Sequence, residues 1–183
     1  TGGIAVYKAV EFVRLLVREG FAPTVVTTEG ARRFVMPLTF AAVSQQAVLD
    51  DETSWRATRG WFEHIEAARR AEALIVAPAT ANTLAKMAAG MADNLLTALY
   101  LAFRGPVVLA PSMNWAMYEH EATRHNIRLL AERGCRIVEG ESGELACGEQ
   151  GAGRMAEPHV ILAALRGALA GTARGPLAGR RII

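Results

Sequence analysis

The sequence predicts an α/β fold, with a doubly wound parallel sheet and helices on both faces. Short apolar segments of strand length alternate with helical segments along most of the chain, which is typical of a parallel sheet that helices cover on both sides. Several of these apolar segments run directly into glycine or small polar residues. Ligands of such Rossmann- or flavodoxin-like folds bind beyond the carboxyl ends of the strands, so these polar ends predict a binding site.

The composition is that of one globular domain and excludes several classes of function. Of the 183 residues, 51% are hydrophobic and 21% are charged, which argues against disorder. A formal net charge of +2 with scattered arginines does not indicate a nucleic-acid partner. No apolar run approaches the ~20 residues that cross a bilayer, and two cysteines are too few for a disulfide framework or a structural zinc. We expect a cytoplasmic protein with no membrane or metal partner.

The most informative stretch is Ala77 to Thr83, which follows the apolar run Ala73 to Val76 and precedes a helical segment. A buried strand that opens into a polar loop and then a helix presents backbone N–H groups to an anion or a flat ligand. Thr80, Asn82 and Thr83 add three short hydrogen-bonding side chains there. The alternative is that Thr80 or Asn82 simply caps the helix that follows.

Ahead of this stretch, Val6, Val10, Val13 and Val17 recur at helical spacing until Gly20, a glycine that predicts the end of the helix. Proline interrupts helices, so Pro37 should separate two short helical pieces. In order, we expect a glycine-rich turn over 1–5, a helix over 6–19, a strand over 24–28, helical pieces over 29–34 and 38–43, a loop with Trp55 and Trp61, and a helix over 65–71.

After this stretch, the Ala-rich segment 82–100 contains Gly90, so it should form two helices with a break near 90–93. Further along, we expect a strand over 106–110, a helix over 122–132, a strand over 135–138, a loop over 140–155 and a helix over 158–170. The glycine-rich segment, residues 140–155, is longer than ordinary connections, which favours a functional clamp.

The polar ends of four predicted strands should meet at one edge of the sheet. These ends are Gly2-Gly3, Thr28, the segment Thr80 to Thr83, and the segment Pro111 to Asn114. A strand is expected ahead of Gly2, since a glycine turn of this kind follows one.

Six blocks, in this order, carry a resemblance to a known family. They are Gly2 to Lys8, Thr28 to Ala31 with Phe34, His64-Ile65, Pro78 to Leu96, Pro111 to Met117, and Gly143 to Met155. Together they resemble the flavin-dependent cysteine decarboxylases, and among these the phosphopantothenoylcysteine decarboxylase domains of coenzyme A biosynthesis. The resemblance implies a main domain over 1–172, with 173–183 as a linker and the start of a truncated ligase-like domain.

The resemblance implies FMN as the cofactor. Glycine lets the backbone approach a phosphate at a helix N-terminus, although the pair at the start of the chain could also be an ordinary tight turn. A neutral set of short polar side chains suits a flavin, whose ring needs hydrogen bonds that tune it. The FMN-binding residues implied are Gly2, Gly3, Ile4, Thr28, Thr80, Ala81, Asn82, Thr83 and Ala110.

The resemblance also implies His64, Asn114 and Cys147 as catalytic residues, with Asn114, Met117 and Cys147 contacting substrate. Histidine is suited to proton transfer near neutral pH, but a lone histidine is more often a surface residue or a cap. Asn114 could simply be a turn residue; as a substrate ligand, its amide would bind a carboxylate without neutralising its charge. Cys147, in the glycine-rich segment, would serve the return step of the reaction.

The function implied is decarboxylation of 4'-phospho-N-pantothenoyl-cysteine to 4'-phosphopantetheine by a homo-oligomer, a trimer or dodecamer. One alternative is a peptidyl-cysteine decarboxylase, which would use the same flavin chemistry. Another is a non-catalytic FMN-binding regulatory subunit, against which the presence of His64, Asn114 and Cys147 argues.

Overall fold

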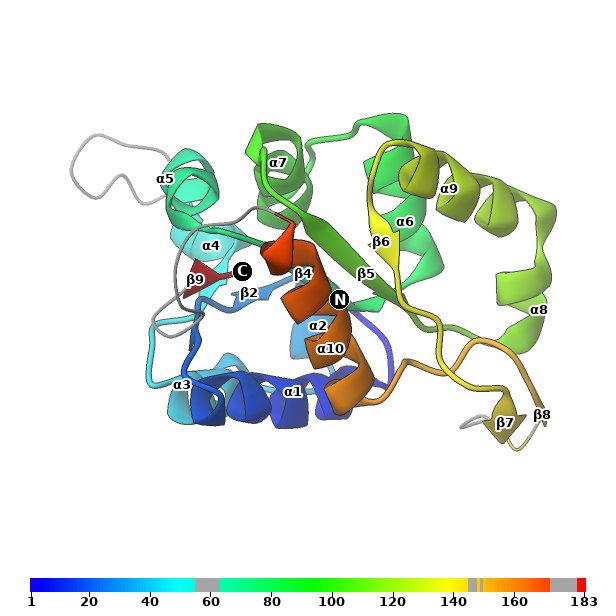
Figure 1. Cartoon of the computed structure of the whole chain (residues 1–183), viewed down its shortest axis with the longest axis horizontal. Helices are drawn as coiled ribbons and strands as arrows, with labels where there is room; N and C mark the ends of the chain where they lie inside the picture. Colours follow the sequence, from blue (N-terminus) through cyan, green and yellow to red (C-terminus); the bar gives the residue numbers. More distant parts are fainter. Residues whose placement is uncertain (55–62, 145–147, 149, 172–180) are drawn as a thin grey trace.

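A parallel β-sheet runs through the middle of the molecule in the computed structural model, which describes residues 1–54, 63–144, 148, 150–171 and 181–183 (Figure 1). Its strands are β1 (Ala22–Pro23), β2 (Val26–Thr27), β3 (Leu49–Asp50), β4 (Leu74–Ala79), β5 (Val107–Pro111), β6 (Arg136–Ile137) and β9 (Arg181–Ile182). Only two residues separate β1 from β2, so these two short strands together occupy one position in the sheet. Counted this way, the pairings give the order β3, β1/β2, β9, β4, β5, β6, and all of the pairs are parallel.

Both faces of the sheet are apolar, as the sequence predicted. Along β4, Leu74 and Val76 pack on one side, whereas Ala73 and Ile75 pack on the other. This alternation follows from the period of two residues in a strand, and a strand buried on both faces reads as a continuous apolar run. A doubly covered parallel sheet is therefore confirmed.

Ten helices formed by the described residues surround the sheet. They are α1 (Val6–Arg18), α2 (Glu29–Arg32), α3 (Pro37–Ser44), α4 (Asp51–Ser54), α5 (Glu63–Arg70), α6 (Ala81–Ala89), α7 (Leu95–Ala102), α8 (Trp115–Glu119), α9 (Glu121–Glu132) and α10 (Pro158–Ala170). Helices α1 and α10 cover one face, with α3 against α1, while α5, α6, α7 and α9 cover the other (Figure 1).

Local sequence sets most helix ends. Gly20 and Gly90 have positive φ values of 83° and 70°, the conformation in which glycine ends a helix most easily. Asn94 begins α7 with a capping box that it shares with Thr97, which satisfies two helix-end N–H groups. The predicted break near 90–93 is confirmed, because α6 ends at Ala89 and α7 begins at Leu95.

Several short elements depart from the sequence predictions. The strand expected over 24–28 is shortened to the two-residue strand β2, while β1, just ahead of it, and β3, α4 and α8 were not predicted. The glycine-rich segment, predicted to be a loop, contains the antiparallel pair β7 (Gly143–Glu144) and β8 (Gln150–Gly151). Such elements are too short to show a period. The predicted loop with Trp55 and Trp61 lies outside the described residues.

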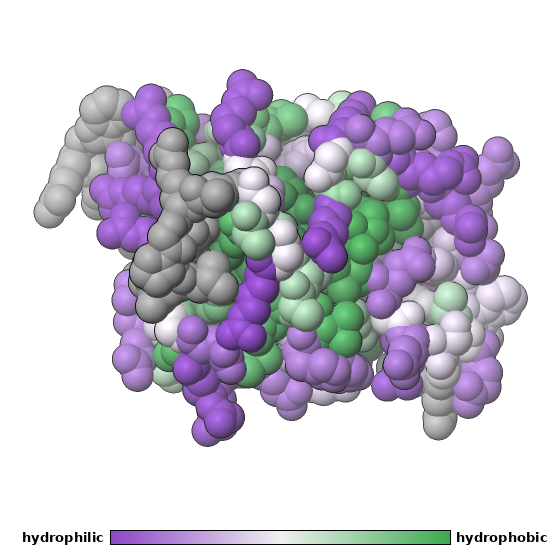
Figure 2. All heavy atoms as spheres, in the orientation of Figure 1, coloured by the Kyte–Doolittle hydropathy of each residue, from purple (hydrophilic) through white to green (hydrophobic). Residues whose placement is uncertain are grey.

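The distribution of hydrophilic and apolar side chains on the surface agrees with this arrangement of helices around the sheet. In the view of Figure 2, hydrophilic side chains occupy most of the periphery, and apolar side chains show in the middle, around α10 and the sheet behind it. Among the described residues, no helix combines the length and the apolar character that crossing a bilayer requires.

Two leucines of α7 test the packing of the sheet face that α5, α6, α7 and α9 cover. Leu99 is fully buried, whereas Leu101 is 44% exposed. We expect Leu99→Ala to lower the free energy of unfolding by about 2–5 kcal/mol, through lost burial and a residual cavity. Leu101→Ala, the control in the same helix, should cost no more than about 0.5 kcal/mol. Urea denaturation measures both; equal losses would show that α7 is packed differently.

Candidate functional site

A cavity of about 1100 Å³ lies at the carboxyl ends of the central strands. The four segments that the sequence predicted to converge all contribute to its lining, three of them directly after β2, β4 and β5. The predicted site residues found there are Gly2, Gly3, Ile4, Thr28, Thr80, Ala81, Asn82, Thr83, Asn114 and Met117. Segments more than a hundred residues apart in the chain thus form one wall, as the topology of a parallel α/β sheet requires.

Two glycines bring the turn ahead of α1 into backbone contact with the start of α2, just after β2. A Cβ atom added to Gly2 would lie 2.7 Å from the carbonyl carbon of Gly30 and 2.8 Å from its Cα. No side chain fits there, so glycine at position 2 is a steric requirement. Helix α1 starts directly behind this contact, with no side-chain cap and no acidic residue in its first turn. Its N-terminus therefore offers N–H groups and the positive end of its dipole to an anion.

Thr80 has both roles that the sequence allowed. It is the N-cap of α6, where its hydroxyl accepts from the N–H of Thr83 at 3.4 Å, and it also lines the cavity. The hydroxyls of Thr80 and Thr83 lie 3.1 Å apart. Thr1 joins the same network, since its hydroxyl donates to the carbonyl of Pro78 at 2.5 Å and accepts from the N–H of Thr80 at 3.2 Å. These bonds fix the loop on which the neutral polar wall depends.

Asn114 is held by the helix that it starts. Its Oδ1 accepts from the N–H of Ala116 at 2.9 Å, which makes it the N-cap of α8. The amide NH2 group therefore points away from that helix end, and NH2 is a donor only. Met117, one turn later in α8, lines the same part of the cavity and is 50% exposed. This end of the cavity combines a fixed amide with an adaptable apolar side chain.

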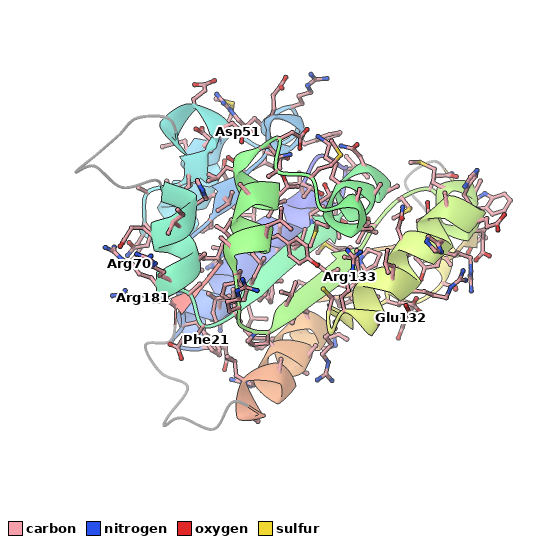
Figure 3. The ribbon with its side chains drawn as sticks, turned by 90° about the horizontal axis from the view of Figure 1, so that it is seen from above. Phe21, Asp51, Arg70, Glu132, Arg133 and Arg181 are labelled. Carbon is pink, nitrogen blue, oxygen red and sulfur yellow. The ribbon has the colours of Figure 1, made fainter. Side chains whose placement is uncertain are left out.

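Ion pairs moderate the charge at the cavity wall. Lys8 lies 2.6 Å from the carboxylate of Glu157, and Lys86 donates a short hydrogen bond to Asp93. Each lysine holds the pKa of its partner carboxyl below the usual value, chiefly through that hydrogen bond. Asp51, near the start of α7 in Figure 3, accepts from the N–H of Leu95 at 2.6 Å.

Two predicted site residues that the structure describes are not part of this lining, and a third lies outside the described residues. Ala110 is fully buried in β5 within the core beneath α1 and α10. His64 lies on α5, partly buried, and is not among the residues that line the cavity. Cys147 lies outside the described residues. The roles given to these three residues stay predictions.

Other lining residues were not singled out as site residues in the sequence analysis, although Ser112 belongs to one of the four segments predicted to converge. They include Asp51, Lys86, Asp93, Ser112 and Gly153. Lys86 and Asp93 fall within a block that carried the family resemblance, but their pairing across the α6–α7 connection has no signal in local spacing. The need for glycine at position 153 is visible only in the folded backbone, where its φ is 113°.

A doubly wound parallel sheet with a large, mostly neutral cavity at its strand ends, open to a helix N-terminus, defines a protein of the nucleotide- or flavin-binding class. The chain belongs to the flavoprotein family, whose sequence profile matches residues 1–170.

Relatives within and near this family are similar over long stretches. The coenzyme A biosynthesis bifunctional protein CoaBC of Bacillus subtilis is 43% identical over 183 residues, all of this chain but 45% of the relative. CoaBC of Escherichia coli is 43% identical over 162 residues, 88% of this chain and 40% of the relative. The chain thus spans less than half the length of these curated relatives.

Solved structures match the fold closely. A PPC decarboxylase mutant complexed with pantothenoylaminoethenethiol superimposes with a TM-score of 0.82 at 31% identity, over 90% of this chain and 92% of the other. The FMN binding protein AtHal3 gives a TM-score of 0.80 at 32% identity, over 94% and 95% of the two chains.

The Lys86–Asp93 pair predicts how the stability of the fold depends on pH. A carboxyl whose pKa is lowered by folding stabilises the fold above its unfolded pKa, and this contribution is lost as the pH falls through the folded pKa. Asp93→Asn should therefore lower Tm at pH 7, and the difference from the wild type should shrink below about pH 4. Thermal scans by circular dichroism measure this.

Glu141→Gln, which removes one negative charge from an exposed position, is the control for net charge. A Tm difference for Asp93→Asn that stays constant between neutral and acid pH would contradict the role given to the pair.

Proposed function

We propose that the chain binds FMN in this cavity and decarboxylates 4'-phospho-N-pantothenoyl-cysteine to 4'-phosphopantetheine, a step of coenzyme A biosynthesis. The observation that carries the proposal is that Gly2, Thr28, Asn82 and Asn114, from the turn ahead of α1 and from the segments that follow β2, β4 and β5, line one cavity. The names of the similar proteins, a PPC decarboxylase and CoaBC, support it. The reaction is proposed to take place in the cytoplasm.

The residues present fit FMN. The contact between Gly2 and Gly30 and the uncapped start of α1 suit the phosphate. The hydroxyls of Thr80 and Thr83 and the amide of Asn82 supply neutral hydrogen-bonding groups for the polar edge of the ring. At about 1100 Å³, the cavity slightly exceeds the ~300–1,000 Å³ range of small-molecule sites, which leaves room for a substrate beside a cofactor.

The chemistry needs a flavin because direct loss of CO2 from a cysteine amide would leave a carbanion with nothing to delocalise it. A bound FMN would supply a hydride acceptor, so that the substrate thiol could become a thioaldehyde once its S–H proton has passed to a base, and the hydride would be returned at the end. In the oxidised substrate, the electron pair of the breaking C–C bond moves onto sulfur as CO2 leaves. The resulting ene-thiolate would take up one proton and the returned hydride at carbon, and a second proton at sulfur would replace the S–H proton lost on oxidation, so the product is again a thiol.

Asn114 is proposed to bind the substrate carboxylate. Its NH2 group points away from α8 because its oxygen is held by Ala116. A neutral amide can orient a carboxylate without the strong ground-state stabilisation that a cation would give, which would raise the barrier to CO2 loss. Met117 would form the apolar wall beside the departing CO2.

The acid–base role is proposed for His64 and the return step for Cys147. His64 does not line the cavity of its own chain, so we place it where a neighbouring copy completes the site in a trimer or dodecamer. Ile4 and Tyr7 support such an interface, because they line the cavity and yet are 58% and 53% exposed. Exposed apolar side chains at the mouth of a site are typical of a surface that another chain covers.

Turnover assays on the FMN-loaded protein test the proposal. CO2 should be released from phosphopantothenoylcysteine, and mass spectrometry should show 4'-phosphopantetheine. Asn114→Ala should lower kcat/KM by about ten- to a hundredfold, the value of a hydrogen bond to a charged group. Asn126→Ala, in α9 and absent from the cavity lining, should have no effect.

His64→Asn should abolish turnover while the protein keeps its yellow colour. Normal turnover in this variant would overturn the role of His64. If the wild-type protein binds FMN but consumes only a peptide with a C-terminal cysteine, the substrate is a peptidyl-cysteine instead. If it consumes neither compound, the enzyme assignment is refuted.

A further inference from the structure

The returning arm of the glycine-rich segment, residues 151–155, packs on the turn that carries Asn114. The N–H of Met113 donates to the carbonyl of Gly153 at 2.9 Å. A Cβ at Gly153 would lie 2.4 Å from the Met113 oxygen, and one at Gly151 would lie 2.8 Å from the Cβ of Trp115. Neither position has room for a side chain, so the arm and the turn are in direct backbone contact.

The outgoing arm of the segment begins at Gly140, and Glu139, directly before it, is fixed to helix α8. Tyr118, in α8 one residue after Met117, donates a short hydrogen bond from its hydroxyl to the carboxylate of Glu139. Glu139 also forms an isolated antiparallel bridge with Met155, and a Cβ at Gly140 would lie 2.2 Å from the carbonyl oxygen of Arg154. The two arms are therefore held against each other and against α8.

The environment of Tyr118 keeps its hydroxyl protonated, so that it remains a hydrogen-bond donor. Its side chain is only 8% exposed and packs in the core cluster with Leu130 and Ile127. Burial is the main reason that its pKa is raised above the usual value, and the hydrogen bond to Glu139 raises it further. The hydroxyl stays protonated at neutral pH and can donate throughout the working range.

We propose that Tyr118, through its hydrogen bond to Glu139, is a positioning residue that holds Asn114 and Met117 of α8 in register with both arms of the glycine-rich segment. This inference rests on the proposed function, in which Asn114 binds the substrate carboxylate. The tyrosine touches neither substrate nor cofactor in this scheme. It acts by fixing α8, a helix of five residues that has little stability of its own.

Tyr118→Phe removes the hydroxyl and keeps the ring in the core. Because Asn114 binds the substrate carboxylate before CO2 leaves, a displaced amide should raise KM for phosphopantothenoylcysteine about tenfold and leave kcat within about twofold. FMN affinity, measured by flavin fluorescence, should not change. Glu139→Ala should reproduce this pattern, Glu139→Gln should restore a low KM because its amide oxygen still accepts, and the double variant Tyr118→Phe/Glu139→Ala should be no worse than either single one.

Tyr100→Phe is the matched control. Its hydroxyl lies 3.7 Å from the sulfur of Cys135 in another part of the same core, and it does not line the cavity. Removing this hydroxyl should leave KM unchanged. An unchanged KM in Tyr118→Phe, with the wild type active, would overturn the positioning role, as would additive effects in the double variant.

Amide hydrogen exchange separates this inference from the proposed function. Tyr118→Phe should speed exchange in 113–119 and 150–155, and Tyr100→Phe should not. If the wild type does not decarboxylate the substrate, the function is wrong, but exchange still decides whether the hydrogen bond anchors the two arms. Unchanged exchange would overturn the anchoring.

Discussion

The backbone contact between Gly2 and Gly30 is the constraint on which the site depends. It presses the turn ahead of α1 against the turn that starts α2, with no room for a Cβ between them. Gly3 lies beside the segment that follows β4, since a Cβ there would be in van der Waals contact, at 3.4 Å, with the side chain of Thr80. Three turns from separate parts of the chain thereby form one continuous wall.

The rest of the molecule supports this wall. The sheet is buried on both faces and sets the strand ends at a common edge, and Thr80, Asn94 and Asn114 each cap a helix beside the cavity. Capping side chains are fixed in direction by the backbone that they satisfy, so the short polar groups of the site are held in defined orientations. Within the wall Lys86 pairs with Asp93, and Lys8 pairs with Glu157, which lies outside the lining, so these charges are offset and neutral hydrogen-bonding groups can dominate the interior.

The sequence predicted the parts of the structure that local chemistry determines. Helix ends at Gly20 and Gly90, the buried run of β4 and the convergence of four polar strand ends follow from glycine conformation, hydrophobic period and parallel topology. It could not predict β3 or α8, which are too short to show a period. Nor could it predict the hydrogen bond from Tyr118 to Glu139, because it joins elements that meet only in the folded chain.

The most direct test of this account is the affinity of the Gly2→Ala variant for FMN, measured by quenching of flavin fluorescence. Its Cβ would lie 2.7 Å from the Gly30 backbone, so the turn ahead of α1 and the start of α2 must separate. We predict at least about a tenfold loss of affinity, because the phosphate site at the start of α1 is then displaced. Gly171→Ala, whose Cβ would meet nothing closer than 3.7 Å, should bind normally. Equal affinities for Gly2→Ala and the wild type would contradict the central claim.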